Sequence, residues 1–571
     1  MARLAKCFHK RGMSRIQFPE DVEFTHVAVE SANRTCEHCC AYLYVTDTRH
    51  RFVWSKSGPT HLIVQVLKCL EPSCVGYKVR VGQEAELAVA LPYWSVTWDV
   101  FAWIGHRRFA RHWSVPQILE ELSDRYHIDA SEDWAEDYLR CYQRMVAARE
   151  ANVQEWAADY QGVEDVMLTI DGLQPEKGHE TLYVVRELRA HRVWFAEPLL
   201  SSSTQEVQKL FERAARIAKE LGKPVRCWMS DKQDAFVKGV ASVFPDVPHR
   251  YCANHFLRDL AKPVLEADSH AKVQMRTKVR GLRDIEKRLL QEVIPAEVQQ
   301  QCCADAVTQD CRVEGPHCAQ GSERQKVVFD YCQAVRGILN NDQGGPITPP
   351  GLRMANALKL VAQSIAQCVG DDSSTPDSGL RQLQRCIERG LGQVCEQLQA
   401  VELYSAETKK VFELLDSAQG SAKNRKARFT RLAAKFLKSQ DPIYQHMGRI
   451  MQSFGKGLFA GGDDPELPVD NLELERAFRL PKSHERRIHG HAHAGVRIVR
   501  QGASLMLVLD AHCRHPKPFE PEELAGYADA PFPDAQLDSE RRRRIMRLAR
   551  SSKQLPLLLA ELEARYRRAA A

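Results

Sequence analysis

The chain has 571 residues, of which 44% are hydrophobic and 27% charged, so it is long enough to form several cores in two to four domains. Its formal net charge of +6 permits nucleic-acid binding without requiring it. No stretch approaches the roughly 18 consecutive apolar residues of a membrane span, and the first ten residues contain no apolar leader segment. We therefore expect a cytoplasmic protein with no membrane partner, in which most of the 18 cysteines are reduced.

Residues 1–92 are rich in strand formers and contain two close pairs of cysteines. Cys36 and Cys39 are separated by two residues, and Cys69 and Cys74 by four. Four thiolates suffice for one closed tetrahedral zinc site, so the spacing predicts a zinc-ribbon-like β module with a structural Zn²⁺. Alternatively, Cys36 and Cys39 are buried thiols, or the neighbouring Cys40 or His38 serves as a ligand.

Residues 93–160 change to a helical period, with a helix start at Trp113-Ser114-Val115-Pro116. The segment resembles a helix-turn-helix, in which a second helix enters the major groove of DNA. Arg107, Arg108 and Arg111 would then contact phosphates, which provide affinity without reading sequence. A three-helix packing module is the alternative interpretation.

From residue 161 the pattern changes to three strands, a helix, a strand, a helix and a short strand. The strands are expected at residues 165–171, 180–188 and 192–198, then before Asp231, and at residues 248–252. This order is that of an RNase H-like core, whose first part spans residues 161–256. Residues 257–465 are nearly all helical by period and form an all-helical insertion; residues 466–512 supply the last helix of the core, and residues 513–571 a basic helical tail.

Two apolar strands of this core each end on an aspartate, Asp171 and Asp231. Carboxylates at the ends of neighbouring buried strands lie at the rim of the sheet, where ligands bind. Two divalent ions about 4 Å apart, held by such carboxylates, activate the attacking oxygen and stabilise the leaving oxygen in phosphoryl transfer. Taken alone, either aspartate is more simply a turn former or a helix cap.

A third acidic ligand is expected from the helix after the insertion, where Glu473 and Glu475 are candidates. They lie two residues apart and so project to different helix faces, and periodicity does not choose between them.

Two further features allow more than one interpretation. The basic runs at Lys272–Arg283, with Arg280 among them, and at Lys423–Lys438 are solvated faces or a DNA track, and the histidines at 489, 491 and 493 are exposed or face DNA rather than bind metal.

Several segments resemble the DDE transposases of bacterial insertion sequences, particularly the Mutator-like kind with a helical insertion in the catalytic core. The resembling segments are Ile170-Asp171-Gly172, Ser230-Asp231-Lys232-Gln233-Asp234-Ala235-Phe236, Phe244 to His255, Asn471-Leu472-Glu473-Leu474-Glu475 and His484-Glu485-Arg486-Arg487. The chain departs from the family pattern at Leu472, where a second Asn is common, and has one Phe where two often follow the catalytic Glu.

The resemblance implies that Asp171, Asp231 and Glu475 are catalytic and hold Mg²⁺ or Mn²⁺, with Glu473 as the second choice for the third ligand. It also implies that His484, Arg486 and Arg487 lie near DNA, and that Cys252 and His255 support the core or orient DNA.

The function implied is that of a transposase, which binds double-stranded DNA at the element ends and catalyses strand cleavage and strand transfer into target DNA. Such enzymes usually act as homo-oligomers on paired ends, and the protein would be associated with the nucleoid. The alternatives are a domesticated, catalytically inactive sequence-specific DNA-binding protein, and a structure-selective nuclease that cuts without joining.

Overall fold

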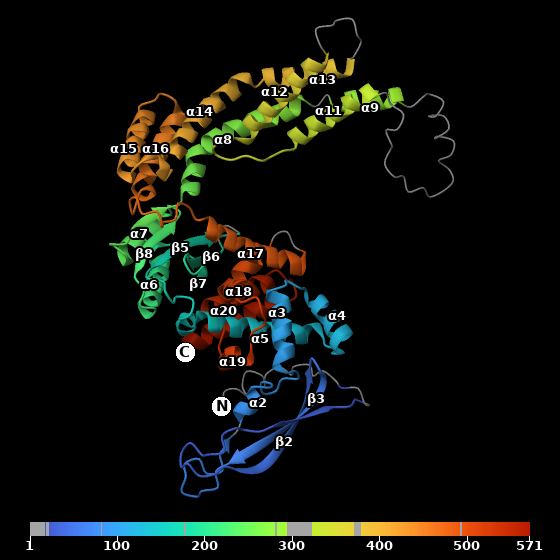
Figure 1. Ribbon diagram of the computed structural model, residues 1–571, viewed down its shortest axis with the longest axis vertical. Helices are drawn as coiled ribbons and strands as arrows, with labels where there is room; N and C mark the ends of the chain where they lie inside the picture. Colours follow the sequence, from blue (N-terminus) through green and yellow to red (C-terminus); the bar gives the residue numbers. More distant parts are fainter. Residues whose placement is uncertain are drawn as a thin grey trace, which may run out of the picture. The chain divides into compact units, whose positions relative to one another are not determined.

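The computed structural model describes residues 18, 22–81, 83–175, 179–279, 282–293, 323–369, 378–490 and 494–570. The chain divides into two compact units, which are described separately (Figure 1). Unit 1 combines the residues up to His249 with Asn471–Ala571, and unit 2 is Arg250–Asp470. The mixed α/β class expected from the sequence is confirmed. In the part of the chain that the structure describes, no helix is both long and apolar enough to span a bilayer.

Unit 1 begins with a small β module that contains one sheet. Its elements are β1 (Thr25–Val29), β2 (Tyr44–Ser55), β3 (Gly58–Lys68), β4 (Arg80–Val81) and the short helix α2 (Gln83–Leu87). β2 and β3 form an antiparallel hairpin, while β1 lies parallel to β3 on its other side. Gly58 at the hairpin turn has φ +118°, a conformation that favours glycine. The β module expected at this end of the chain is present.

Three helices follow, α3 (Trp98–Phe109), α4 (Val115–Tyr126) and α5 (Glu132–Ala151), with the 3₁₀ turn η1 (Val153–Trp156) after them. The helix start expected at Ser114 is confirmed: its side chain accepts from Gln117 N, and the Gln117 side chain accepts from Ser114 N. α3 and α5 pack closely because Gly105 lies against the ring of Tyr142, where a Cβ atom would be 2.3 Å away.

The central sheet of unit 1 has the strand order β7-β6-β5-β8-β9. Its strands are β5 (Val166–Leu173), β6 (Thr181–Glu187), β7 (Arg192–Leu199), β8 (Val225–Ser230) and the short β9 (His249–Tyr251), the last of which ends in unit 2. β5, β6 and β7 form an antiparallel meander, and β8 joins β5 in parallel. The strands agree with the positions expected from the sequence to within a few residues at each end.

Helices cover both faces of this sheet. On one face, α6 (Thr204–Glu220) and α7 (Asp234–Val243) share a core with Leu168, Ile170 and Trp228. On the other face, α17 (Leu472–His489) and α18 (Gly495–Arg514) pack with α3, α5 and the buried side chains of β6 and β7. Burying side chains such as Leu474 and Phe478 of α17 contributes about 1.5 to 3 kcal/mol each.

The helices of residues 98–151 therefore share one hydrophobic core with the sheet and with the helices after residue 471. A buried ion-pair network strengthens this joint: Arg192 of β7 pairs with Glu150 and Asp159, and Arg514 of α18 pairs with the same two acids and with Asp510. The chain then continues through α19 (Pro521–Leu524), η3 (Ala525–Tyr527), α20 (Asp534–Ala549) and α21 (Leu555–Ala570).

Unit 2 is helical apart from the end of β9. Its elements are α8 (Ala253–Lys278), α9 (Leu282–Val293), α11 (Glu323–Leu339), α12 (Pro350–Val369), α13 (Ser378–Gly392), α14 (Cys395–Glu413), η2 (Ser417–Gln419), α15 (Ala422–Leu437) and α16 (Pro442–Leu458). The buried Asp268 of α8 accepts hydrogen bonds from the first amides of α12, Gly351 N and Leu352 N, and so joins the two helices. Part of the first basic run is neutralised inside this unit, because Lys272 and Arg276 pair with Asp342; Arg280 lies outside the described residues.

Candidate functional site

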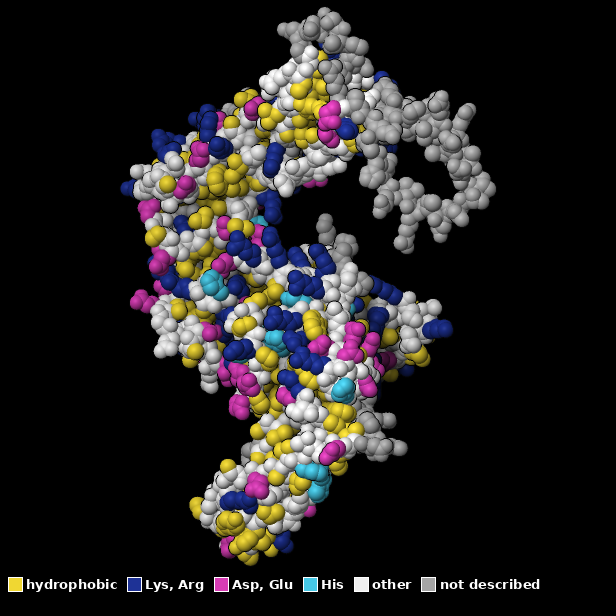
Figure 2. Space-filling model, turned by 45° about the vertical axis from the view of Figure 1, so that its right-hand side comes forward, with side chains coloured by type: hydrophobic (Ala, Val, Ile, Leu, Met, Phe, Trp, Pro, Cys, Tyr) yellow, Lys and Arg dark blue, Asp and Glu magenta, His cyan; other side chains and the backbone are white. Residues whose placement is uncertain are grey.

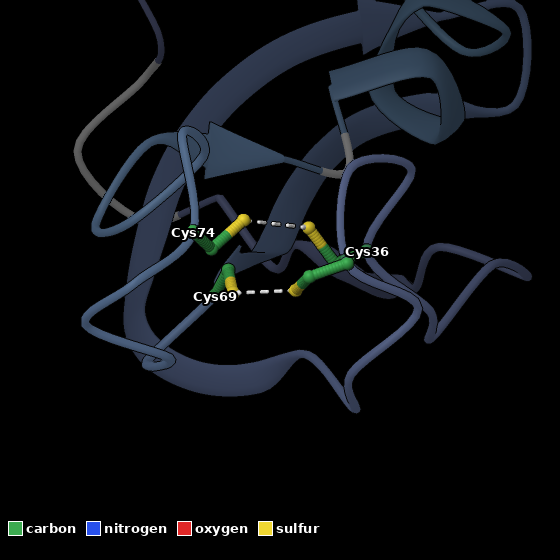
Figure 3. A group of neighbouring side chains, drawn as sticks. Cys36, Cys69 and Cys74 are labelled. Atoms are coloured by element: carbon green, nitrogen blue, oxygen red, sulfur yellow. Dashed lines mark hydrogen bonds between the residues drawn. The ribbon is translucent and has the colours of Figure 1, made fainter.

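The four cysteines singled out by their spacing come together in the β module. Cys36 and Cys39 lie in a turn closed by the hydrogen bonds Cys40 N to Cys36 O and Cys36 N to Ala41 O. Cys69 follows β3, and Cys74 lies in the next turn, where Tyr77 N donates to Cys74 O. Figure 3 shows the labelled thiols directed toward one another. We call this group the cysteine cluster.

The geometry of the cysteine cluster fits a tetrahedral metal ion. All four sulfur atoms lie within 4.8 Å of one another, with 3.7 Å between the Sγ atoms of Cys36 and Cys74 and 3.6 Å between those of Cys39 and Cys69. These separations far exceed a disulfide bond of about 2.05 Å. They match the edge of about 3.8 Å in a tetrahedron with zinc–sulfur bonds of about 2.3 Å. The donor set therefore suits zinc.

The surroundings of the cysteine cluster are shaped around the thiols. Backbone hydrogen bonds from His38 and Cys39 lower the pKa of Cys36 to about 6, whereas burial raises the pKa of Cys74 to about 12. Gly76 allows the His38 ring to lie close to the backbone beside the thiols, because a Cβ atom at Gly76 would be only 2.8 Å from that ring. His38 and Cys40, the alternative ligands, are not members of the group.

The two strand-end aspartates lie at the same edge of the central sheet. The parallel register of β5 and β8 pairs Thr169 with Met229, and continuing it by two residues places Asp171 opposite Asp231. Both side chains are half-buried. Asp171 Oδ1 accepts from Gly172 N at 2.7 Å, and Asp231 Oδ1 accepts from Gln233 N at 3.2 Å. We call this rim the carboxylate edge.

Both aspartates project from the same face of the sheet. Side chains alternate along a strand, so Asp171 shares a face with Thr169 and Asp231 shares one with Met229. The opposite face carries Leu168, Ile170 and Trp228, which α6 and α7 cover. The two carboxylates are therefore on the side of the sheet where α17 and α18 pack.

The start of α17 is fixed to β5 beside the carboxylate edge. Asn471, buried just before the helix, accepts through Oδ1 a short hydrogen bond from Thr169 Oγ1, two residues before Asp171. Leu474 and Phe478 anchor the same helix in the core. The chain thus returns to β5 at Asn471 after the whole of unit 2.

This junction distinguishes the two candidate glutamates. Glu475 lies one helical turn after Asn471 and so shares its face, and helical side chains lean toward the N-terminus of their helix. Glu475 therefore lies on the side of α17 that carries Asn471, and its backbone N–H donates to Asn471 O. Glu473 lies on another face, where its Oε2 is 3.1 Å from Nδ1 of the exposed His191 in the β6–β7 turn. The geometry favours Glu475 as the third acid.

The carboxylates are not gathered as tightly as the thiols. Among the residues that the structure describes, the cysteine cluster is the one group of three or more Cys, His, Asp or Glu side chains whose ligand atoms lie within 4.8 Å of one another. Asp171, Asp231 and Glu475 do not form such a group. Three negative charges repel one another unless a cation lies between them.

A half-buried histidine that the sequence analysis did not single out supports the strand before Asp231. His249 Nε2 lies 2.7 Å from the hydroxyl oxygen of Ser230, the last residue of β8. Burial lowers the pKa of His249 to about 4, so the ring is neutral near pH 7. The only sequence signal for this role is its position in the short strand after Pro248.

The arginines expected to contact DNA have different environments. Arg107 lies against the rings of Trp103 and Trp113, 5.2 and 5.1 Å from their centroids. Arg108 donates to Trp113 O at 3.0 Å, and burial lowers its pKa to about 10. Exposed positions are occupied by Arg111, Arg486 and Arg487. Figure 2 shows Lys and Arg side chains gathered in several patches on one face of the molecule.

The role expected for His484 is corrected by its burial. Only 1% of the residue is exposed, and its ring stacks on Phe109 with centroids 5.7 Å apart. Its Nδ1 lies 3.0 Å from Nδ1 of His112, and burial lowers its pKa to about 2. His484 is therefore a neutral packing residue between α17 and α3 rather than an exposed DNA contact. Sequence pattern could not show this, because the partner lies on a helix far away in the chain.

The helices α3 and α4 do not present a basic face suited to the major groove. Most of α3 is buried in the shared core, and α4 carries Glu120, Glu121 and Asp124 against the single basic residue Arg125. DNA-reading helices rely on positive charge near phosphates. These observations favour the alternative of a three-helix packing module for this segment.

The remaining residues named from the sequence lie at the start of α8 and at the end of α17. Cys252 is buried and immediately precedes α8, and His255 lies in the first turn of that helix. His489 Nε2 is 3.9 Å from Glu485 Oε2, while His491 and His493 lie outside the described residues. Neither a protein-family model nor a curated protein matches the chain. The functional assignment therefore depends on the residues described above.

Proposed function

We propose that the protein is a DDE transposase, a metal-dependent enzyme that cuts double-stranded DNA at element ends and joins the cut strand to target DNA. One observation carries the proposal: Asp171, two residues before the end of β5, and Asp231, directly after β8, lie opposite each other on adjacent parallel strands, and the Asn471–Thr169 hydrogen bond fixes to β5 the helix that bears Glu475. The strand order β7-β6-β5-β8-β9 supports an RNase H-like core with a helical insertion between β9 and α17.

Three carboxylates are the type of ligand that Mg²⁺ or Mn²⁺ requires, and Asp171, Asp231 and Glu475 would hold these ions. When bound, the ions supply charge stabilisation to the attacking and leaving oxygens of an in-line displacement. Gly172 N and Gln233 N orient the two aspartates through hydrogen bonds to the Oδ1 atom of each. Ser230 and His249 hold the end of β8 in place.

The other parts would serve DNA binding. The β module with its cysteine cluster would act as a zinc ribbon, and the exposed Arg111, Arg486 and Arg487 would contact phosphates. A transposase of this type works on two element ends at once, so we propose a homo-oligomer assembled on DNA and associated with the nucleoid.

The proposal is tested with purified protein, duplex DNA taken from both flanks of the gene, and Mg²⁺ or Mn²⁺. We expect cleavage at defined positions and strand-transfer products on sequencing gels. The variant E475Q should lose both products, because the third acid is removed. The matched variant E473Q should keep them, since Glu473 engages His191 away from the junction.

Three outcomes would decide against the proposal. DNA binding without any cleavage would favour the alternative of a catalytically inactive DNA-binding protein. Cleavage without joined product would favour a nuclease. Equal activity of E475Q and wild type would show that Glu475 is not a metal ligand.

A further inference from the structure

A hollow of about 440 Å³ in unit 1 is lined almost entirely by arginine. We call it the arginine pocket; it is formed by residues of α5, α18 and α20. Its lining comprises six arginines, one glutamate and one leucine: Arg140, Arg500, Leu537, Glu540, Arg541, Arg543, Arg544 and Arg547.

The positive charge of the arginine pocket is only partly neutralised. Arg140 pairs with Glu540 at 2.7 Å, and Arg543 pairs with Glu180 at 3.1 Å. Arg541 makes an exposed pair with Asp538 at 3.5 Å. Arg500, Arg544 and Arg547 form no ion pair with any residue in the described part of the chain. Several guanidinium groups that converge without matching carboxylates are suited to bind an anion.

The arginine pocket is tied to the same edge of the central sheet as Asp171 and Asp231. Glu180, which is fully buried, accepts from Arg542 Nε at 2.8 Å and from Arg543 Nη2 at 3.1 Å. Glu180 directly precedes β6, whose Leu182 pairs with Leu173, two residues beyond Asp171. The register therefore places the attachment of α20 on the β6 side of the edge, with the aspartates on its β5 and β8 side.

We propose that the arginine pocket binds successive phosphates of a DNA strand that runs along the carboxylate edge. This inference rests on the proposed function and extends it by naming a second contact for the same strand. One phosphodiester carries a single negative charge, so a single group would leave most of the guanidinium charge unbalanced, whereas a strand offers several phosphates in a row. Arginine forks match phosphate oxygens, and such contacts position a strand without reading its sequence.

The phosphate groups bound in the arginine pocket could belong to DNA or to a free polyphosphate, and we propose that they belong to DNA. The pocket variant R541Q/R544Q/R547Q removes three exposed guanidinium groups and leaves the buried pair of Glu180 with Arg542 and Arg543 intact. The matched control R565Q/R567Q/R568Q removes the same charge from exposed positions of α21 that do not line the pocket.

Binding of labelled duplex DNA is measured by fluorescence anisotropy at several salt concentrations without divalent metal. The pocket variant should bind roughly tenfold or more weakly at about 0.1 M salt, and its plot of log K against log salt should be shallower by about 2 to 3. The control should keep the wild-type slope. Thermal unfolding of both variants by circular dichroism verifies that they fold.

Arginine modification on the wild-type protein gives a second measurement that needs no variant. Duplex DNA should protect Arg541, Arg544 and Arg547 from phenylglyoxal, read by mass spectrometry, better than sodium tripolyphosphate does. Stronger protection by tripolyphosphate, or an unchanged slope in the pocket variant, would overturn the DNA assignment. DNA binding is measured without metal, so it is independent of cleavage. If the pocket variant loses DNA binding as expected but the wild type never cuts DNA, only the transposase reaction is refuted. If the wild type cuts and joins DNA but the pocket variant keeps the wild-type slope of log K against log salt, only the role of the arginine pocket is refuted.

Discussion

The cysteine cluster and the carboxylate edge use different routes to bring ligand atoms together. The four thiols come from two turns of one small module, and their sulfur atoms already have the spacing of a tetrahedral ion. The acids come from β5, from the residue after β8 and from α17, three elements that meet only when unit 1 is complete, and their oxygen atoms do not all lie within 4.8 Å of one another. A site that staples a module can be built from local turns, whereas a site at a sheet rim depends on the whole fold.

The largest effect is expected from Cys36→Ser, because metal binding and folding of such a module are one process. In zinc-finger peptides this binding contributes about 10 kcal/mol or more. The variant should lose the zinc that we expect in the wild type, and the β module should unfold while the central sheet stays folded. Metal analysis and limited proteolysis measure the two effects. Cys40→Ser, next to the cluster but outside it, should keep one zinc per chain; a zinc-loaded Cys36→Ser would contradict the assignment.

Asp171→Asn should show the opposite behaviour: DNA cleavage should be lost, whereas the thermal stability of the protein should remain unchanged. Removing one carboxylate takes several kcal/mol of charge stabilisation from the transition state, so DNA cleavage should fall on the order of 10³-fold. The side chain is half-buried at the rim, so the thermal midpoint should change little. Asp234→Asn, an exposed residue in the first turn of α7, is the matched control and should remain active. Similar cleavage rates for the two variants would remove Asp171 from the site.

A smaller effect, on stability, is expected from breaking the hydrogen bond between Asn471 and Thr169, which fixes α17 to β5. Asn471→Ala leaves the Thr169 hydroxyl without its buried partner, which should lower the free energy of unfolding by about 1 to 3 kcal/mol. Urea unfolding of Asn471→Ala, Thr169→Val and the double variant measures the coupling between the two residues. A coupling energy near zero would show that the junction is not fixed by this hydrogen bond.

A pH-dependent effect on stability is expected from His512 in the packed core behind the rim. Burial lowers the pKa of His512 to about 3, so its ring stays neutral in the folded state while it gains a proton near pH 6.5 when unfolded. The stability it contributes is complete above pH 6.5 and is lost as the pH falls toward 3. In His512→Gln the free energy of unfolding should fall less steeply between pH 6 and 4, by about 1.4 kcal/mol per pH unit. The free energies of unfolding are measured by urea titration at each pH. If they change with pH equally in the variant and the wild type, His512 is not the group that takes up the proton on unfolding.

Local patterns in the sequence were sufficient for the elements and for the cysteine cluster. Alternating and continuous apolar runs located β5 to β9, and Ser114 followed by Pro116 marked the start of α4, because these signals depend on neighbours a few residues apart. The cysteine spacings worked for the same reason. The identity of the metal and the DNA chemistry stay predictions.

Contacts between distant segments could not be read in the same way. The burial of His484 depends on Phe109 of α3 and on His112 in the loop after it, and the arginine run at residues 541–544 is partly used to neutralise Glu180. The segment at residues 93–160, expected to stand as a DNA-binding region, shares its core with α17 and α18. Periodicity shows which face of a helix is apolar and leaves open what that face packs against.

The hydrogen bond between Thr169 and Asn471 joins residues that are 302 positions apart. A ribosome that adds about 5 to 20 residues per second needs about 15 to 60 s to travel from one to the other. Throughout that interval β6 and β7 exist without α17 and α18, and the apolar side chains of Leu182, Val184 and Val193 lack their cover. A nascent chain is therefore prone to aggregate until the translation of its last hundred residues, and a fragment truncated before Asn471 should be recovered in inclusion bodies.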